Sequence, residues 1–151
     1  QAVDAGREGF VVLDTAPTGH TLLLLDAAEA YHREVLRTRG EMPASVVELL
    51  PRLRDAEYTK ILIVTLPEAT PVHEAERLQA DLARAGIAPH AWVINQSLAV
   101  SGTQDSLLLR RGQFELPYIR RVAEQLAPRA ALLPWFATAP EGSAGLAQLA
   151  R

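Results

Sequence analysis

The chain has 151 residues, a formal net charge of −3 at pH 7 and no cysteine. Its length suits one domain, and the lack of cysteine excludes disulfides and cysteine-based zinc or redox sites within these residues. The small negative charge gives no electrostatic reason to expect nucleic acid or an anionic membrane surface as a partner. No apolar run approaches the ~18 residues that a membrane-spanning helix needs. We therefore expect a soluble, cytoplasmic domain with no nucleic-acid partner and no direct membrane insertion.

The first expected strand is an apolar run that ends in an acidic residue. Residues Phe10 to Leu13 predict a strand buried on both faces, and Asp14 follows at its carboxyl end. In an open parallel α/β sheet, the carboxyl ends of the strands line the ligand crevice. The small and polar residues that come next, 15–21, include the glycine Gly19. A strand-end aspartate before a glycine-containing loop is typical of P-loop NTPases, where the aspartate holds hydrated Mg²⁺ and the loop senses the γ-phosphate.

The rest of the chain alternates between helical and strand patterns. Apolar residues at helical spacing predict helices, and continuous apolar or β-branched runs predict strands. Expected helices cover 22–38, Ser45–Leu53, Thr70–Ala85, Thr103–Leu126 with an interruption at Pro117, and Gly142–Arg151; expected strands cover Lys60–Leu66, Ile87–Asn95 and Ala130–Leu133. Strands that alternate with helices imply a parallel sheet with helices on both faces. The sequence therefore predicts an α/β fold, a parallel β-sheet flanked by helices.

Several residues within these elements carry structural expectations. Thr70 is a plausible N-cap with Pro71 at the first helical position, and Gly86 should end that helix. We expect Trp92 and Trp135 in the core.

The string DTAPTGHT at residues 14–21 is more specific than a general strand-and-loop pattern. It resembles the signature of the arsenical pump-driving (arsenite-translocating) ATPase family, which also includes ATPases that target tail-anchored membrane proteins. The similarity continues through LLLLD (22–26), AYHRE (30–34), TLPEATPV (65–72) and INQSL (94–98). It therefore covers nearly the whole chain and looks most like the second half of the tandem arsenical pump ATPase, a P-loop NTPase-like fold.

The resemblance implies roles for the residues of the signature. Asp14 would bind Mg²⁺ through water, and Thr15, Thr18 and Gly19 would form the catalytic switch that moves with the γ-phosphate. His20 is a candidate ligand for As(III) or Sb(III). A hydrogen-bonded switch histidine is the equal alternative, because no cysteine is present here to share the metalloid.

The same resemblance places adenine recognition at the ends of the later strands. Asn95 and Gln96 would meet the edge of the base, since a side-chain amide donates and accepts at once. Pro134 and Phe136 would pack on its face. The alternatives are a loop-capping role for Asn95 and simple core packing for Pro134 and Phe136. Glu68 is first a helix-start carboxylate and only secondarily a candidate contact for ribose or a partner half.

No stretch of the chain matches the phosphate-binding loop G-x-x-x-x-G-K-[S/T]. We therefore expect a C-terminal fragment of an ATPase nucleotide-binding domain, inactive alone. A parallel sheet without the P-loop strand should expose edges or an apolar face, so self-association is expected.

The expected function is ATP hydrolysis coupled to arsenite or antimonite efflux. Its partners would be a homologous ATPase half, or a second copy, and a membrane arsenite pump subunit that holds the protein at the inner membrane. The alternative is a client- or partner-binding module of the tail-anchored protein targeting type.

Overall fold

The computed structural model describes residues 9–14, 49–147 and 149, and the chain forms two compact units, residues 1–41 and 42–151. In the first unit, residues 9–14 form no strand, and Phe10 is 88% and Leu13 64% exposed. The prediction of a buried strand over Phe10–Leu13 is therefore wrong. A buried parallel strand needs neighbours and covered faces, which apolar character alone does not supply. The helix predicted over 22–38 lies outside the described residues.

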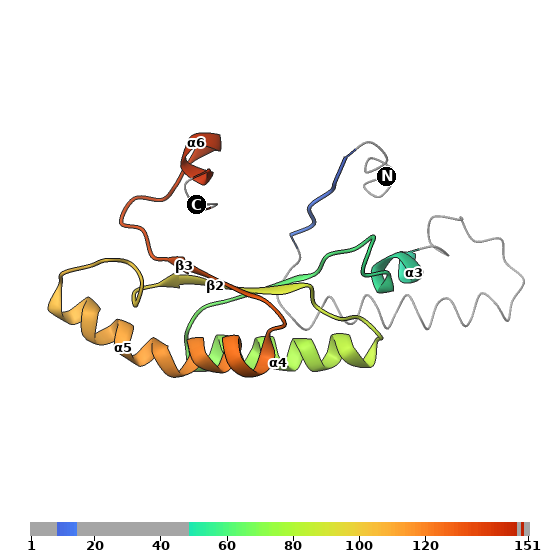
Figure 1. Ribbon diagram of the computed structural model, residues 1–151, viewed down its shortest axis with the longest axis horizontal. Coiled ribbons are helices and arrows are strands. Elements are labelled where there is room, and N and C mark those ends of the chain that lie inside the picture. The colour runs from blue at the N-terminus through green and yellow to red at the C-terminus, as the bar shows by residue number, and fades with distance from the viewer. Residues whose placement is uncertain (1–8, 15–48, 148, 150–151) are drawn as a thin grey trace, which may run out of the picture. The chain divides into compact units, whose positions relative to one another are not determined.

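The second unit contains a sheet of three parallel strands (Figure 1). β1 (Leu62–Thr65), β2 (Ala91–Ser97) and β3 (Ala130–Pro134) lie in that order, and each pairs with the next. The predicted parallel α/β fold is confirmed. β2 begins later than the strand predicted from Ile87, because the Ile87 N–H donates to the Leu82 carbonyl oxygen at the end of α4 (2.9 Å) and not to a neighbouring strand.

Helices connect the strands and cover one face of the sheet (Figure 1). α4 (Ala69–Arg84) joins β1 to β2, while α5 (Ser106–Arg121) and a π-helix, η2 (Val122–Leu126), join β2 to β3. The core lies beneath the sheet and contains fully or nearly fully buried side chains: Ile63, Val72, Trp92, Ile94 and Val122. On the other face, Leu62 and Val64 of β1 are 54% and 61% exposed. The expectation that helices cover both faces does not hold for β1 in the described residues.

Helix α4 begins earlier than predicted. Its N-cap is Glu68 rather than Thr70, and the backbone N–H of Val72 already donates to the Glu68 carbonyl oxygen (3.1 Å). Pro71 lies inside the first turn, where its missing N–H leaves no intrahelical bond unmade. The prediction for the other end is confirmed, since Gly86 adopts φ 75° just after the helix.

Helix α5 runs through Pro117 without the predicted interruption. The proline removes one backbone donor, but Glu115 and Val122 are buried on either side and hold the segment against its neighbours. The irregularity comes one turn later in η2, where the Ala127 N–H bonds to the Val122 oxygen (2.9 Å), a π-type bond. The predicted interruption at Pro117 is therefore wrong, and the irregular segment follows the end of α5.

Two further short helices lie in the described part of the second unit. α3 (Leu49–Arg54) lies within and just beyond the predicted Ser45–Leu53, of which 45–48 are outside the described residues. α6 (Gly142–Leu146) is shorter than the tail helix predicted over Gly142–Arg151. No helix in the described ranges is both long enough and apolar enough to cross a membrane.

Candidate functional site

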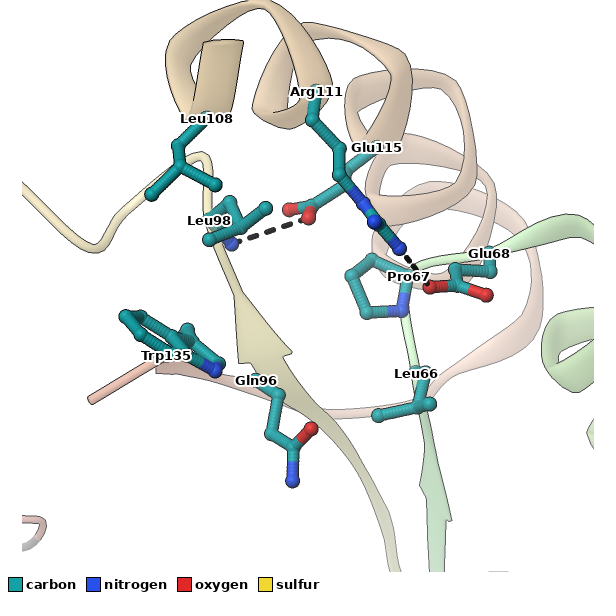
Figure 2. A pocket seen from close by; sticks show the side chains of 9 residues that line it. All are labelled: Leu66, Pro67, Glu68, Gln96, Leu98, Leu108, Arg111, Glu115 and Trp135. Atoms are coloured by element: carbon teal, nitrogen blue, oxygen red, sulfur yellow. Dashed lines mark hydrogen bonds and ion pairs between the residues drawn. The ribbon is translucent and has the colours of Figure 1, made fainter. Parts of the chain in front are cut away.

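A pocket of about 280 Å³ lies at the carboxyl edge of the sheet (Figure 2). The segments that follow β1, β2 and β3 build its base, and α5 closes one side. Its lining residues are Leu66, Pro67, Glu68, Gln96, Leu98, Leu108, Arg111, Glu115 and Trp135. This is the edge at which parallel α/β sheets bind their ligands.

Trp135 gives the pocket an aromatic wall. It directly follows β3, and 41% of its surface is exposed. Figure 2 shows Trp135 and Gln96 across the pocket from Arg111 and Glu115. The prediction that Trp135 belongs to the core is therefore wrong, whereas Trp92 is fully buried as expected. The position of Trp135 just past the end of β3 could have indicated this, because the carboxyl ends of the strands line the crevice.

Beside Trp135, strand β2 ends in a bulge. The register between β2 and β3 shifts between Ile94 and Ser97, and Gln96 has φ 58°. This left-handed conformation is uncommon for a non-glycine residue. The Asn95 side-chain oxygen accepts from the Gln96 backbone N–H (2.9 Å). The Trp135 backbone N–H donates to the Ser97 carbonyl oxygen (2.9 Å). A bulge at a sheet edge re-aims side chains, and here it brings Gln96 to the pocket.

Glu115 of α5 is a buried carboxylate that sequence reasoning missed. It is 7% exposed, and its oxygens accept from the Ser97 hydroxyl (2.8 Å), the Leu98 N–H (3.2 Å) and the Ala99 N–H (3.1 Å). Helical spacing could have revealed it, because Glu115 shares one face of α5 with the buried Gly112, one turn earlier. The carboxylate fixes the loop that leaves β2.

An exposed ion pair spans the pocket between two helices. Nη2 of Arg111 lies 3.3 Å from Oε1 of Glu68, and the two side chains are 67% and 53% exposed. Glu68 thus lines the pocket, and its carboxylate pairs with this arginine. The pair adds charge of both signs at the rim.

The remaining predicted base-binding residues, Asn95, Pro134 and Phe136, are next to Gln96 and Trp135 in sequence but do not line the pocket. Asn95 and Pro134 are half-buried, and Phe136 is 38% exposed. Asn95 makes the capping bond that its alternative interpretation required, and that bond leaves the donors of its amide for another partner.

The signature, residues 14–21, belongs to the first unit. Asp14 is exposed, while Thr15, Thr18, Gly19 and His20 lie outside the described residues. Within residues 9–14 and 49–147, no three histidine, aspartate or glutamate side chains gather as metal ligands would.

The arrangement is suited to holding a flat, partly polar group. Trp135 offers a ring for stacking, Leu98 and Leu108 offer apolar surface, and Gln96 offers an amide. Pockets for drug-sized ligands measure roughly 300–1,000 Å³, so about 280 Å³ fits one part of a nucleotide, such as its base.

Comparison with known proteins identifies the family. A family model described as "Anion-transporting ATPase" matches residues 26–151. The chain is 54% identical to an Arsenical pump-driving ATPase of Escherichia coli and 52% identical to one of Acidiphilium multivorum, each over 97% of the chain and 25% of the relative. It is 27% identical to ATPase GET3C of Arabidopsis thaliana over 67% of the chain and 34% of that protein.

The chain thus spans about a quarter of the length of the two bacterial relatives. The family match over residues 26–151 takes in well over half of the chain, and so the protein belongs to the anion-transporting ATPase family.

Proposed function

We propose that this chain is the C-terminal part of a nucleotide-binding half of an ATPase of the arsenical pump-driving type. The observation that carries the proposal is the pocket at the carboxyl edge of a parallel sheet, in a member of an ATPase family. At 54% against 27% identity, the relatives favour the arsenical pump type over the GET3 type. In this role the second unit supplies the base pocket of the ATPase.

The pocket is proposed to hold adenine. The base stacks on Trp135, and the amides of Asn95 and Gln96 meet its polar edge. Pro134 and Phe136, which flank Trp135 in sequence, are proposed to add apolar surface next to the bound base. Adenine has both donors and acceptors on its edge, which side-chain amides match in either orientation.

The signature loop is proposed to serve the phosphates. Asp14 is a single exposed carboxylate, and one carboxylate with retained water suits Mg²⁺. When bound, Mg²⁺ neutralises charge on the phosphate oxygens. Thr15, Thr18 and Gly19 form the switch, and His20 is a ligand for As(III) or Sb(III) as cargo or a switch hydrogen-bond donor. A homologous half and a membrane pump subunit are the proposed partners.

The tryptophans allow a direct test of base binding. Trp135 is 41% exposed and Trp92 is fully buried, so acrylamide should quench mainly Trp135. We expect adenosine to protect Trp135 in the 151-residue chain, and Trp135→Leu to abolish the protection. Inorganic triphosphate, which lacks the base, is the matched ligand control. Equal protection by triphosphate, or none by adenosine at millimolar concentration, would contradict the base pocket.

A second arm addresses hydrolysis. With Mg-ATP, the 151-residue chain should release no phosphate, because its sequence contains no P-loop motif to hold the phosphates. Phosphate release that Asp14→Asn abolishes would show that these residues build a phosphate site by themselves. The proposal that the chain lacks part of the phosphate site would then be wrong.

A further inference from the structure

We propose that Glu115 is a positioning residue, which holds the bulge at the end of β2 and thereby sets Gln96 in the pocket. The geometry of this link stands on residues 95–115 and Trp135, whereas its relevance to ligand binding rests on the proposed function. Three observations carry it: the donors that converge on Glu115, the close approach at Gly112, and the left-handed conformation of Gln96.

The donors around Glu115 require a carboxylate. Oε2 accepts from the Ser97 hydroxyl and the Ala99 N–H, and Oε1 accepts from the Leu98 N–H. A carboxylate offers acceptor sites on both oxygens, whereas an amide offers them on one. In either orientation, a glutamine at this position would turn its NH₂ group toward at least one backbone N–H. Glutamine therefore keeps the shape and loses part of the bonding.

Gly112 shows that α5 is built to approach this loop. A Cβ at Gly112 would lie 2.9 Å from the Ala99 nitrogen and 3.1 Å from the Leu98 carbonyl carbon. Backbone atoms at these distances cannot move aside as a flexible side chain can. Gly112 and Glu115 are one turn apart on α5 and contact the same loop residues. The glycine removes a steric barrier where the carboxylate supplies the bonds.

The link to Gln96 runs through Ser97. The hydroxyl of Ser97 is held by Glu115, and its carbonyl oxygen accepts from the Trp135 N–H. Ser97 is fully buried. Its side chain and its carbonyl group are therefore both held in place directly after Gln96. A residue in a sparsely populated conformation persists only where its surroundings hold it there. Glu115 is the part of those surroundings that comes from α5.

The conformation of Gln96 can be read directly by nuclear magnetic resonance. The three-bond coupling between its amide and α protons, with its Cα and Cβ shifts, distinguishes a left-handed from an extended backbone. We would measure these in the 151-residue chain and in Glu115→Gln and Glu115→Ala. Glu124→Gln makes the same change at an exposed glutamate on η2 and serves as the control. Adenosine affinity, followed at Trp135, is measured in parallel.

We expect Glu115→Gln and Glu115→Ala to lose the left-handed signature of Gln96, while Glu124→Gln retains it. Adenosine affinity should fall roughly tenfold in Glu115→Gln, because a hydrogen bond to a charged group is lost. Global destabilisation alone would leave Gln96 left-handed in the folded molecules. A folded Glu115 variant with an unchanged Gln96 signature would therefore overturn the inference.

The two proposals fail in different ways. If the wild-type chain binds no adenosine but Glu115→Gln still releases Gln96, the base pocket is refuted and the positioning link stands. If Glu115→Ala does not fold, Ser97→Ala removes from the loop side the one bond that joins Glu115 to the residue after Gln96. In that variant, a retained Gln96 signature with wild-type adenosine affinity would also overturn the inference.

Discussion

The two faces of β1 both carry apolar side chains, but they are unequally buried in the structure. Ile63 is 2% exposed, whereas Leu62 and Val64 on either side of it are 54% and 61% exposed. Successive side chains of a strand point to opposite faces. α4 and α5 lie along one face only (Figure 1). The position of the helices therefore decides which face of β1 is buried. The apolar side chains of the strand would allow either face to be covered.

The covered face also carries specific polar contacts. The Trp92 indole N–H donates to the side-chain oxygen of Gln79 (2.7 Å), and the Gln79 NH₂ donates to the Leu126 carbonyl (3.1 Å). These bonds join β2, α4 and η2 around one side chain. The covered face is therefore fixed by both packing and hydrogen bonds, and substitutions there should cost far more than on the exposed face.

The largest effect is expected from Trp92→Ala. Trp92 is 0% exposed, and removing a buried aromatic side chain costs about 3–5 kcal/mol of unfolding free energy. Urea unfolding measures the change. Val64→Ala, on the exposed face of β1, is the control and should cost less than about 1 kcal/mol. Similar losses for the two variants would show that both faces contribute equally.

A smaller effect is expected from Gln79→Ala. The substitution leaves the indole N–H of buried Trp92 and the Leu126 carbonyl without their partner. An unsatisfied buried polar group costs about 1–3 kcal/mol. Gln113→Ala makes the same change at an exposed site in α5 and should be nearly neutral. A neutral Gln79→Ala would mean that water replaces the lost bonds.

The ion pair between Glu68 and Arg111 tests how much an exposed contact between two helices contributes to stability. It joins α4 to α5 but is more than half exposed at both ends, and exposed pairs contribute about 0.2–1 kcal/mol. Glu68→Gln should therefore cost less than Gln79→Ala, and the loss should shrink at high salt. Lys60→Gln, which removes the cation of another exposed pair, is the control. A salt-independent loss above this range would indicate that the pair is shielded from water.

The alternation of apolar runs and helical stripes was sufficient to predict the parallel fold. It could not predict which face would be covered, because continuous apolar runs are typical of strands buried on both sides. For this reason Phe10–Leu13 and the outward-facing Leu62 and Val64 are exposed, although β1 itself lies within the predicted strand Lys60–Leu66. Whether an apolar side chain is buried depends on elements distant in sequence.

Of the residues that line the pocket, Glu68 and Gln96 were candidates from the sequence. The resemblance also pointed to Pro134 and Phe136, which flank Trp135 in sequence but are not lining residues. Trp135 was missed because tryptophan is usually buried, and Glu115 was missed because a single glutamate on a helix usually faces water. Only the approach of α5 to the loop at 97–99 gives Glu115 its partners, and a local pattern does not contain that approach.

The smallest change in stability is expected on the exposed face of the sheet. Leu62→Thr combined with Val64→Thr keeps β-branched or strand-favouring side chains and removes exposed apolar surface. The unfolding free energy should stay within about 0.5 kcal/mol of the wild-type value. Ile63→Thr, one residue away on the covered face, is the matched control and should be clearly destabilising, because Ile63 is 2% exposed.

The same double variant tests what the exposed face does in solution. Uncovered apolar surface on a sheet favours association with other chains, so the wild-type chain should self-associate and Leu62→Thr/Val64→Thr should shift it toward monomer in sedimentation equilibrium. The stability of each molecule and its association would then depend on opposite faces of one strand. A wild-type chain that is monomeric at all accessible concentrations would show that the exposed face drives no association. A double variant as destabilised as Ile63→Thr would show that both faces are buried, and the contrast between them would fail.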